Sequence, residues 1–239
     1  MLEGTKVISE ALDAGVALEA VFVAPGDDSV RPLLQRALDA GVRVHALQAG
    51  LIERVADTVT PQPVMAIAPW VDVPLDAVRD ADFIVVCVDL RDPGNAGTVL
   101  RSAEAAGASA VVFCDGSVDV FNPKTVRASA GSLFHVPVVN GGAATDVLQT
   151  LGEWGVHRLG TVACDGESIP FGRPVDAYDE IDLTRSVALV LGNEAHGLPD
   201  DLPLDGGVTI PMAGSGESLN VGMAAAVLCF EVARQRRHA

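Results

Sequence analysis

The sequence has few aromatic residues and lacks any long uninterrupted apolar run. Phe, Trp and Tyr together make up 4% of the 239 residues, whereas hydrophobic residues make up 49% and charged residues 20%. This balance excludes intrinsic disorder and indicates a globular protein. No apolar run approaches the roughly 18 residues that a membrane helix needs, and no secretory signal opens the chain. We therefore expect a cytoplasmic protein without a membrane segment.

Cysteine is equally sparse, with single residues at positions 87, 114, 164 and 229. Each lies in or beside an apolar run, and none has the paired spacing of a metal site. We expect free buried thiols, as in a reducing compartment, and no bound metal.

Positive charge is scarce too, because 16 Lys and Arg stand against 32 Asp and Glu, for a formal net charge of −16. Proteins that bind nucleic acids usually present a basic surface, since neutralising phosphates supplies much of their affinity. The acidity therefore favours a small-molecule enzyme, unless the basic residues gather on one face or a dimer concentrates them.

Residues 1–68 alternate between helical and strand patterns, which predicts a small α/β domain. A helix is expected at Thr5–Ala14, and Ser29 is expected to cap a second helix that ends at Ala40. Strands are predicted at 18–24, 42–47 and 64–68, and a short helix at 51–56.

Residues 69–82, which contain prolines and several acids, are predicted to link this domain to a second one at 83–239. The second domain alternates strands with helices, a rhythm that predicts a parallel sheet. Its expected strands are Phe83–Val88, Val111–Phe113, Arg158–Ala163 and Val187–Leu191, and its expected helices are Ala96–Ala106, Ala144–Trp154 and Leu219–Arg236.

Two glycine-rich loops follow predicted strands near the carboxyl end, with glycines at 192, 197, 214 and 216. Glycine lets the backbone turn tightly and approach a ligand closely. Asn193, Glu194, Ser218 and Asn220 lie in these loops at strand ends, where open α/β sheets bind their ligands. Ser218 and Asn220 could alternatively cap the last helix.

Three segments together resemble the motifs of the SpoU-type RNA ribose methyltransferases, members of the knotted SPOUT class. They are Asp92–Arg101, Leu189–Pro199 and Ile210–Val221, which occur in the family's order, and the resemblance extends over residues 83–236. Residues 1–68 resemble, more loosely, the ribosomal-protein-like substrate-binding domain that precedes many such catalytic domains, through Glu3-Gly4 and Asp57–Pro61. Relatives usually carry more residues before that Glu-Gly pair, so the chain is expected to begin abruptly.

The resemblance implies a set of site residues. Asn95 and Arg101 coincide with the first-motif asparagine and arginine, although spacing alone favours an exposed Arg101 paired with Glu104. The implied catalytic residues are Arg101, Asn95, Glu194, Ser218 and Asn220. The implied cofactor contacts are Gly192, Asn193, Gly197, Ile210, Met212, Leu219, Thr161 and Ala163. Two basic residues of the segment 119–132, Lys124 and Arg127, are expected RNA contacts, although a solvated helix start is an alternative.

The fold and activity also follow from the resemblance. It implies a trefoil knot at the carboxyl end and methyl transfer from S-adenosylmethionine to a ribose 2′-hydroxyl of structured RNA. The thiostrepton-resistance-like branch is the nearest, which favours 23S ribosomal RNA over tRNA. Such chemistry must align the hydroxyl, take its proton and exclude water, and it needs no metal.

Arg101 is expected to position a phosphate and stabilise the developing alkoxide, because a guanidinium is normally charged and a poor base. The family proposal makes this arginine the proton acceptor instead. Relatives form homodimers in which it acts toward the partner's cofactor, and an apolar last helix fits such a dimer. The alternatives are a tRNA 2′-O-methyltransferase, a non-catalytic RNA-binding protein that retains the fold, and an unrelated small-molecule α/β enzyme.

Overall fold

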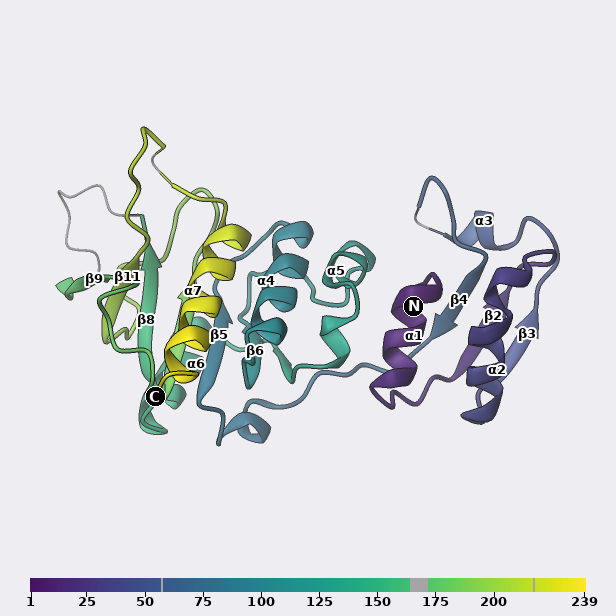
Figure 1. Cartoon of the computed structure of the whole chain (residues 1–239), viewed down its shortest axis with the longest axis horizontal. Coiled ribbons are helices and arrows are strands. Elements are labelled where there is room, and N and C mark those ends of the chain that lie inside the picture. Colours follow the sequence, from purple (N-terminus) through teal and green to yellow (C-terminus); the bar gives the residue numbers. More distant parts are fainter. Residues whose placement is uncertain (57, 164–171, 217) are drawn as a thin grey trace.

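The computed structural model describes residues 1–56, 58–163, 172–216 and 218–239, which form two β-sheets side by side (Figure 1). Several expectations lie outside the described residues: the loop that begins at Cys164, Asp57 of the predicted turn, and Glu217 of the third motif.

The amino-terminal sheet has four strands in the order β1-β4-β2-β3. β2 and β3 are parallel, whereas β4 runs antiparallel to β1 and β2. This confirms the small α/β unit. Its elements are β1 Leu2–Glu3, α1 Thr5–Asp13, β2 Ala20–Val23, α2 Arg31–Asp39, β3 Arg43–Ala46, α3 Ile52–Val55 and β4 Val64–Ile67.

The predicted cap at Ser29 is wrong. Ser29 lies inside a short 3₁₀ helix, Asp28–Val30, and α2 begins after it at Arg31. The side chain of Asp27 caps that turn by accepting a hydrogen bond of 2.9 Å from the backbone N–H of Ser29. A run of three residues that can all cap helices, Asp27 to Ser29, made the position ambiguous.

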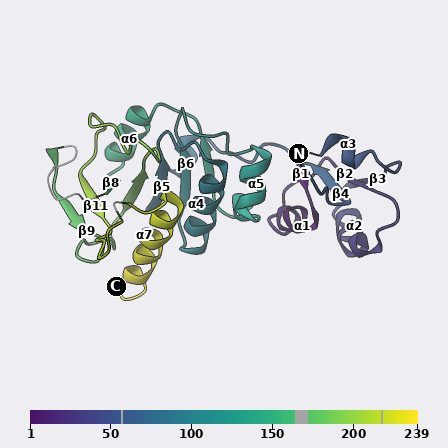
Figure 2. The ribbon, with the colours of Figure 1, turned by 90° about the horizontal axis from the view of Figure 1, so that it is seen from above.

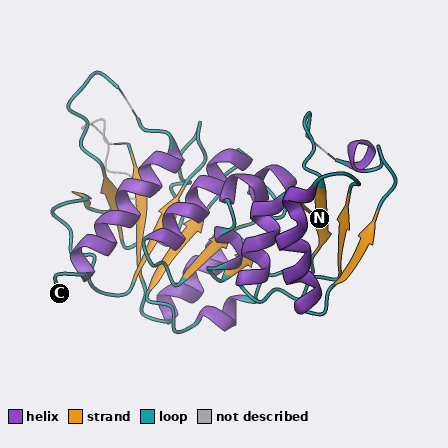
Figure 3. Ribbon diagram, turned by 45° about the vertical axis from the view of Figure 1, so that its right-hand side comes forward, coloured by secondary structure: helices purple, strands orange, loops and turns teal. Residues whose placement is uncertain are grey.

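The second sheet has seven parallel strands in the order β7-β6-β5-β10-β8-β11-β9, which confirms the predicted parallel sheet. Figure 3 shows strands in orange packed among the purple helices. Its strands are β5 Phe83–Cys87, β6 Ala110–Phe113, β7 Val138–Asn140, β8 His157–Val162, β9 Val175–Ala177, β10 Val187–Leu191 and β11 Gly206–Thr209. Its helices are α4 Pro93–Ala105, α5 Pro123–Ser129, α6 Ala144–Glu153 and α7 Val221–Arg236. The trefoil knot stays a prediction.

The seven-stranded sheet is covered on both faces (Figure 2). Successive residues of β5 point to opposite sides, so that Val85 packs in one cluster with α4 and α7 while Val86 packs with α6. This double burial explains why β5 and β10 are fully apolar.

Helix α4 begins earlier than expected. The helix expected from Ala96 starts at Pro93, and Asp92 precedes it as the N-cap. Asp92 is the N-cap and accepts a 2.8 Å hydrogen bond from the backbone N–H of Asn95, and Pro93 occupies the first helical position. The first motif is therefore the capped amino-terminal turn of a helix.

The two halves of the chain contact one another through α1, β1, α5 and the 3₁₀ helix Ser132–Phe134. Arg127 lies 3.9 Å from the carboxylate of Glu3, and His135 Nε2 lies 3.0 Å from Glu10 Oε2. Buried side chains of both halves belong to one continuous apolar cluster. The predicted linker contains a 3₁₀ helix at Leu75–Val78.

The three cysteines that the structure describes are buried and free, as expected. Burial raises the pKa of Cys114 and of Cys229 to about 12, so both thiols are protonated at neutral pH. Within the described residues, no helix combines the length and apolar character needed to cross a membrane.

Gly97 on α4 allows the close approach of α5. A Cβ at this position would lie 2.3 Å from the Cβ of Ala128 and 2.7 Å from its carbonyl carbon. Gly97→Ala should therefore force the helices apart and lower the free energy of unfolding by about 1–3 kcal/mol, measured by urea denaturation. Gly214→Ala is the control, because nothing lies within 4 Å of that Cβ. Equal unfolding midpoints for the two variants would contradict this packing.

Candidate active site

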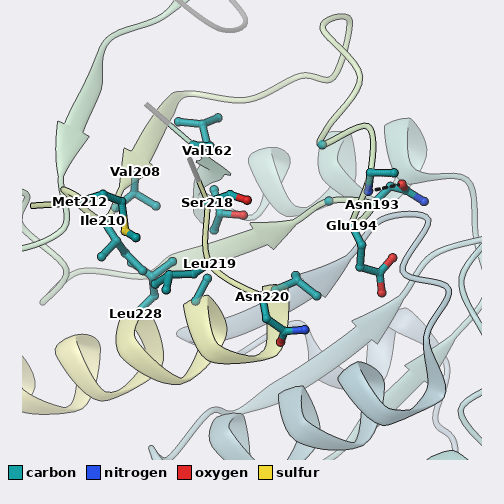
Figure 4. A pocket seen from close by; sticks show the side chains of 17 residues that line it. Val162, Asn193, Glu194, Val208, Ile210, Met212, Ser218, Leu219, Asn220 and Leu228 are labelled. Carbon is teal, nitrogen blue, oxygen red and sulfur yellow. Dashed lines mark hydrogen bonds between the residues drawn. The ribbon is translucent and has the colours of Figure 1, made fainter. Parts of the chain in front are cut away.

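A cavity of about 470 Å³ lies where β8, β10 and β11 end and α7 begins (Figure 4). It brings together segments that are far apart in the sequence. All eight of the residues expected to contact a cofactor line it: Thr161, Ala163, Gly192, Asn193, Gly197, Ile210, Met212 and Leu219. Three of the expected catalytic residues line it as well, namely Glu194, Ser218 and Asn220.

One wall of the cavity is apolar. Val208, Ile210, Leu219 and Leu228 line it, and Met212 on the same side is 42% exposed (Figure 4). A cavity of this volume, with an apolar wall and a few polar groups, matches the sites that bind ligands of drug or cofactor size. S-adenosylmethionine, which joins a flat adenine to a charged tail, fits such a lining.

Gly192 is required by the loop itself. A Cβ on Gly192 would lie 2.5 Å from the carbonyl carbon of Gly197 and 2.8 Å from the backbone nitrogen of Leu198. Asn193 and Gly197 close this loop with two backbone hydrogen bonds, of 3.0 Å and 2.9 Å. The loop thus folds back onto its own strand end, and this closure shapes one side of the cavity.

Three polar side chains, one from each motif, meet beside the cavity. The side-chain amide of Asn95 donates to Glu194 Oε1 at 3.0 Å, and the amide of Asn220 donates to Asn95 Oδ1 at 3.0 Å. The chain Asn220–Asn95–Glu194 thereby connects the start of α7, the start of α4 and the loop after β10. Asn95 itself does not line the cavity but joins two residues that do.

Glu194 is held as a carboxylate. Its oxygens also accept the backbone N–H groups of Asp92, at 3.2 Å, and Arg91, at 3.4 Å. Partial burial acts to raise the pKa of Glu194, but the hydrogen bonds from Asn95 and the backbone outweigh it and hold the pKa below its ordinary value. The site therefore carries a fixed negative charge at neutral pH.

Asn220 serves two purposes. Its Oδ1 accepts the backbone N–H groups of Gly222, at 2.9 Å, and Met223, at 3.3 Å, and so caps α7. Its Nδ2 makes the contact with Asn95. The capping role and the site role, which the sequence presents as alternatives, therefore coexist in one residue.

Asp89 holds a residue of the cavity lining, a contact that the sequence did not predict. Asn193 donates its side-chain amide to both the backbone oxygen and Oδ2 of Asp89, each at 3.0 Å. Asp89 has a φ of 53°, a left-handed conformation that Asp and Asn tolerate better than most residues. Asp89 lies just after a buried strand and just before the first motif, and this position in the sequence could have indicated that it lies near the site.

The basic residues lie apart from the cavity. Arg101 is exposed on α4 and does not line the cavity, and Lys124 is exposed on α5. Neither takes part in an ion pair with another described residue, whereas Arg127 lies beside Glu3. Glu104, the partner that spacing suggested for Arg101, instead accepts a 3.4 Å hydrogen bond from Ser132. Within the described ranges, no three His, Cys, Asp or Glu residues are grouped as metal ligands.

Family comparisons cover nearly the whole chain. Residues 82–230 match the model of the SpoU rRNA Methylase family, and residues 1–70 match that of the RNA 2′-O ribose methyltransferase substrate-binding domain. The three motifs of the site all fall within the first match.

Individual relatives agree with this. The chain is 33% identical to the 23S rRNA (guanosine(2553)-2′-O)-methyltransferase RlmP of Bacillus subtilis, over 97% of this chain and 87% of the relative. An AdoMet-bound rRNA methyltransferase from Sinorhizobium meliloti superposes with a TM-score of 0.79 at 30% identity, over 99% of this chain and 86% of that one. AviRb from Streptomyces viridochromogenes, in complex with AdoMet, gives 0.81 at 28% identity, over 100% and 90%. The chain therefore belongs to the SpoU rRNA methylase family and is an RNA ribose 2′-O-methyltransferase that uses S-adenosylmethionine.

Proposed function

We propose that the protein methylates a ribose 2′-hydroxyl in 23S ribosomal RNA, with S-adenosylmethionine bound in the cavity beside Glu194. The observation that carries the proposal is the hydrogen-bonded chain from Asn220 through Asn95 to Glu194, which joins all three motifs at the cavity. The ribosomal substrate rests on the likeness to the Bacillus subtilis enzyme, which extends over both halves of this chain. With such a substrate we also propose a cytoplasmic location.

The chain's own residues have a limited chemical task. S-adenosylmethionine supplies, when bound, a methyl group that its sulfonium already activates. The anionic Glu194 favours a cationic ligand in the cavity, and it fixes Asn95 and Asn220 in one arrangement. The loop from Gly192 to Gly197 and the apolar wall limit the access of water.

Arg101 contributes the positive charge. We propose that its guanidinium binds the phosphate next to the target ribose and stabilises the alkoxide that develops at the 2′-oxygen. Because Arg101 is exposed and lies outside the cavity of its own chain, it can serve a site that a second subunit completes. Lys124 and Arg127 on α5 extend the positive charge toward the RNA, and Arg127 in addition holds Glu3.

A homodimer through α7 fits this arrangement. The helix exposes Met223 at 63%, Val227 at 37% and Phe230 at 51%, which lie on one face at intervals of four and three residues. The opposite face packs on the sheet and on α4. An apolar stripe of this kind is buried in many symmetric dimers. The dimer would bring the α4 helices and the cavities of two subunits close together.

Cofactor binding can be tested at Ala224, which lines the cavity from α7. Ala224→Leu should fill part of the cavity and weaken S-adenosylmethionine binding at least about tenfold, measured by calorimetry. Ala233→Leu, a partly exposed alanine on the same helix outside the lining, is the matched control. Parallel assays with labelled cofactor and total RNA, followed by mapping, identify the methylated nucleotide. If Ala224→Leu bound S-adenosylmethionine with unchanged affinity, the cofactor would not bind in this cavity. Methyl label found only in tRNA would refute the ribosomal substrate.

The charge of Glu194 predicts a pH dependence. A carboxylate whose folded-state pKa is lowered adds stability that is complete above its ordinary pKa of 4.5 and is lost as the pH falls through the folded value. The stability difference between the parent protein and Glu194→Gln should thus be constant from about pH 7 to pH 5 and shrink only below about pH 4.5. Urea denaturation across that range measures it. A difference that already declines near pH 6 would indicate a raised pKa instead.

The composite site can be tested by subunit mixing. Arg101→Ala should be inactive but bind the cofactor, whereas Ala224→Leu should bind it at least about tenfold more weakly and be inactive at a cofactor concentration that saturates only the parent. Unfolded, mixed and refolded together, the two variants should form heterodimers with one intact site and recover a sizeable share of activity. Heterodimers without recovered activity would place Arg101 and the cavity in the same subunit. Sedimentation of the parent as a monomer would refute the dimer directly.

A further inference from the structure

Trp70 is unusually exposed for its type. It follows β4 in the segment between the two sheets, and 73% of its surface is accessible. The chain has only two tryptophans and one tyrosine, so a large aromatic ring left in solvent stands out. Burying an indole is strongly favourable. The folded chain leaves the Trp70 ring exposed although burying it would be favourable.

The indole is backed by a second ring. The Trp70 and Phe121 rings have centroids 4.6 Å apart at an interplanar angle of 57°. Phe121 is fixed in turn, because its backbone N–H donates to Asp119 Oδ1 at 2.9 Å. The next residue, Asn122, caps α5 by accepting from the N–H of Lys124 at 2.9 Å.

The segment that carries Trp70, between β4 and the seven-stranded sheet, is anchored on both sides. Ile67 accepts a backbone hydrogen bond of 2.8 Å from Glu19 in the amino-terminal half. Val73 donates one of 2.8 Å to Val138, at the edge of the seven-stranded sheet. The indole is therefore held in place before any ligand arrives, which lowers the entropic cost of binding.

A basic residue lies close in sequence to this pair of rings, and its charge is suitable for RNA. Lys124, three residues after Phe121, is exposed, is one of only two lysines in the sequence, and forms no ion pair with another described residue. By contrast, eight arginines of the described chain are paired with carboxylates. The adjacent acid, Asp119, is occupied by the backbone N–H of Phe121.

We propose that Trp70, backed by Phe121 and flanked by Lys124, is a platform on which an unpaired base of the RNA substrate stacks. Proteins read RNA chiefly at unpaired nucleotides, whose bases stack on exposed aromatic rings beside a positive charge. A docking protein would instead need a broad complementary surface of roughly 800 Å² on each side. The platform rests on the proposed function, and it gives the acidic chain an RNA contact that depends little on net charge.

Fluorescence tests the platform directly. In a Trp154→Phe background Trp70 is the only tryptophan, so its emission reports on that site alone. A mixed-sequence single strand of about 12 nucleotides should quench it, and a blunt RNA duplex of equal length should quench it far less. Trp70→Ala should bind the single strand about tenfold more weakly, and Trp70→Phe should retain most of the affinity. Leu38→Ala, which removes a side chain 54% exposed on α2, is the control.

Activity separates this proposal from the methyltransferase assignment. Trp70→Ala should raise the KM for ribosomal RNA while kcat and the affinity for S-adenosylmethionine stay at the parent's values. A parent that methylates RNA with a KM that Trp70→Ala leaves unchanged would overturn the platform alone. A parent that neither binds nor methylates RNA would overturn both. Dissociation of a dimer by Trp70→Ala, with RNA binding intact, would assign the ring to a second copy of the chain and refute the stacking site.

Discussion

The site depends on the carboxylate of Glu194, which accepts three hydrogen bonds from the segment Arg91–Asn95. Two come from the backbone N–H groups of Arg91 and Asp92, one comes from Asn95 directly, and Asn95 relays the contact to Asn220. Without Glu194, two backbone donors just before α4 would lose their partner, and Asn95 would keep only its hydrogen bond with Asn220.

The acidity of the chain and its RNA substrate are compatible because the charges are distributed unevenly. Most of the paired arginines serve structure, as Arg158 does when it donates to Asp205 at 2.6 Å and 2.8 Å. The cations left without a carboxylate among the described residues include Arg101 and Lys124, on two helices that pack together. In the proposed mode of binding, RNA would meet the local charge at α4 and α5, which can attract it despite the net value of −16.

Much of the fold could be predicted because the strands of the large sheet are buried on both faces. Phe83–Cys87 and Val187–Leu191 are unbroken apolar runs, and each was placed to within a residue. The Ser29 cap failed because neighbouring residues compete for the same local hydrogen bond. The cavity lining was predictable through resemblance, whereas Asp89 and the Asn95 relay depend on contacts between residues about a hundred positions apart. Local sequence patterns likewise cannot predict the pairing of Arg127 with Glu3, which joins the two halves of the chain.

The apolar cluster shared by the two halves also has a consequence for how the chain can be divided. Leu133 and Val136 of the catalytic half belong to the same cluster as Val7 and Ile8 of α1. Cutting the chain in the linker would leave apolar surface on each fragment, which favours aggregation over independent folding. Exchange of the amino-terminal unit between relatives would therefore require the matching surface around Leu133 to be exchanged with it. In this protein the module boundary in sequence is not a boundary in the core.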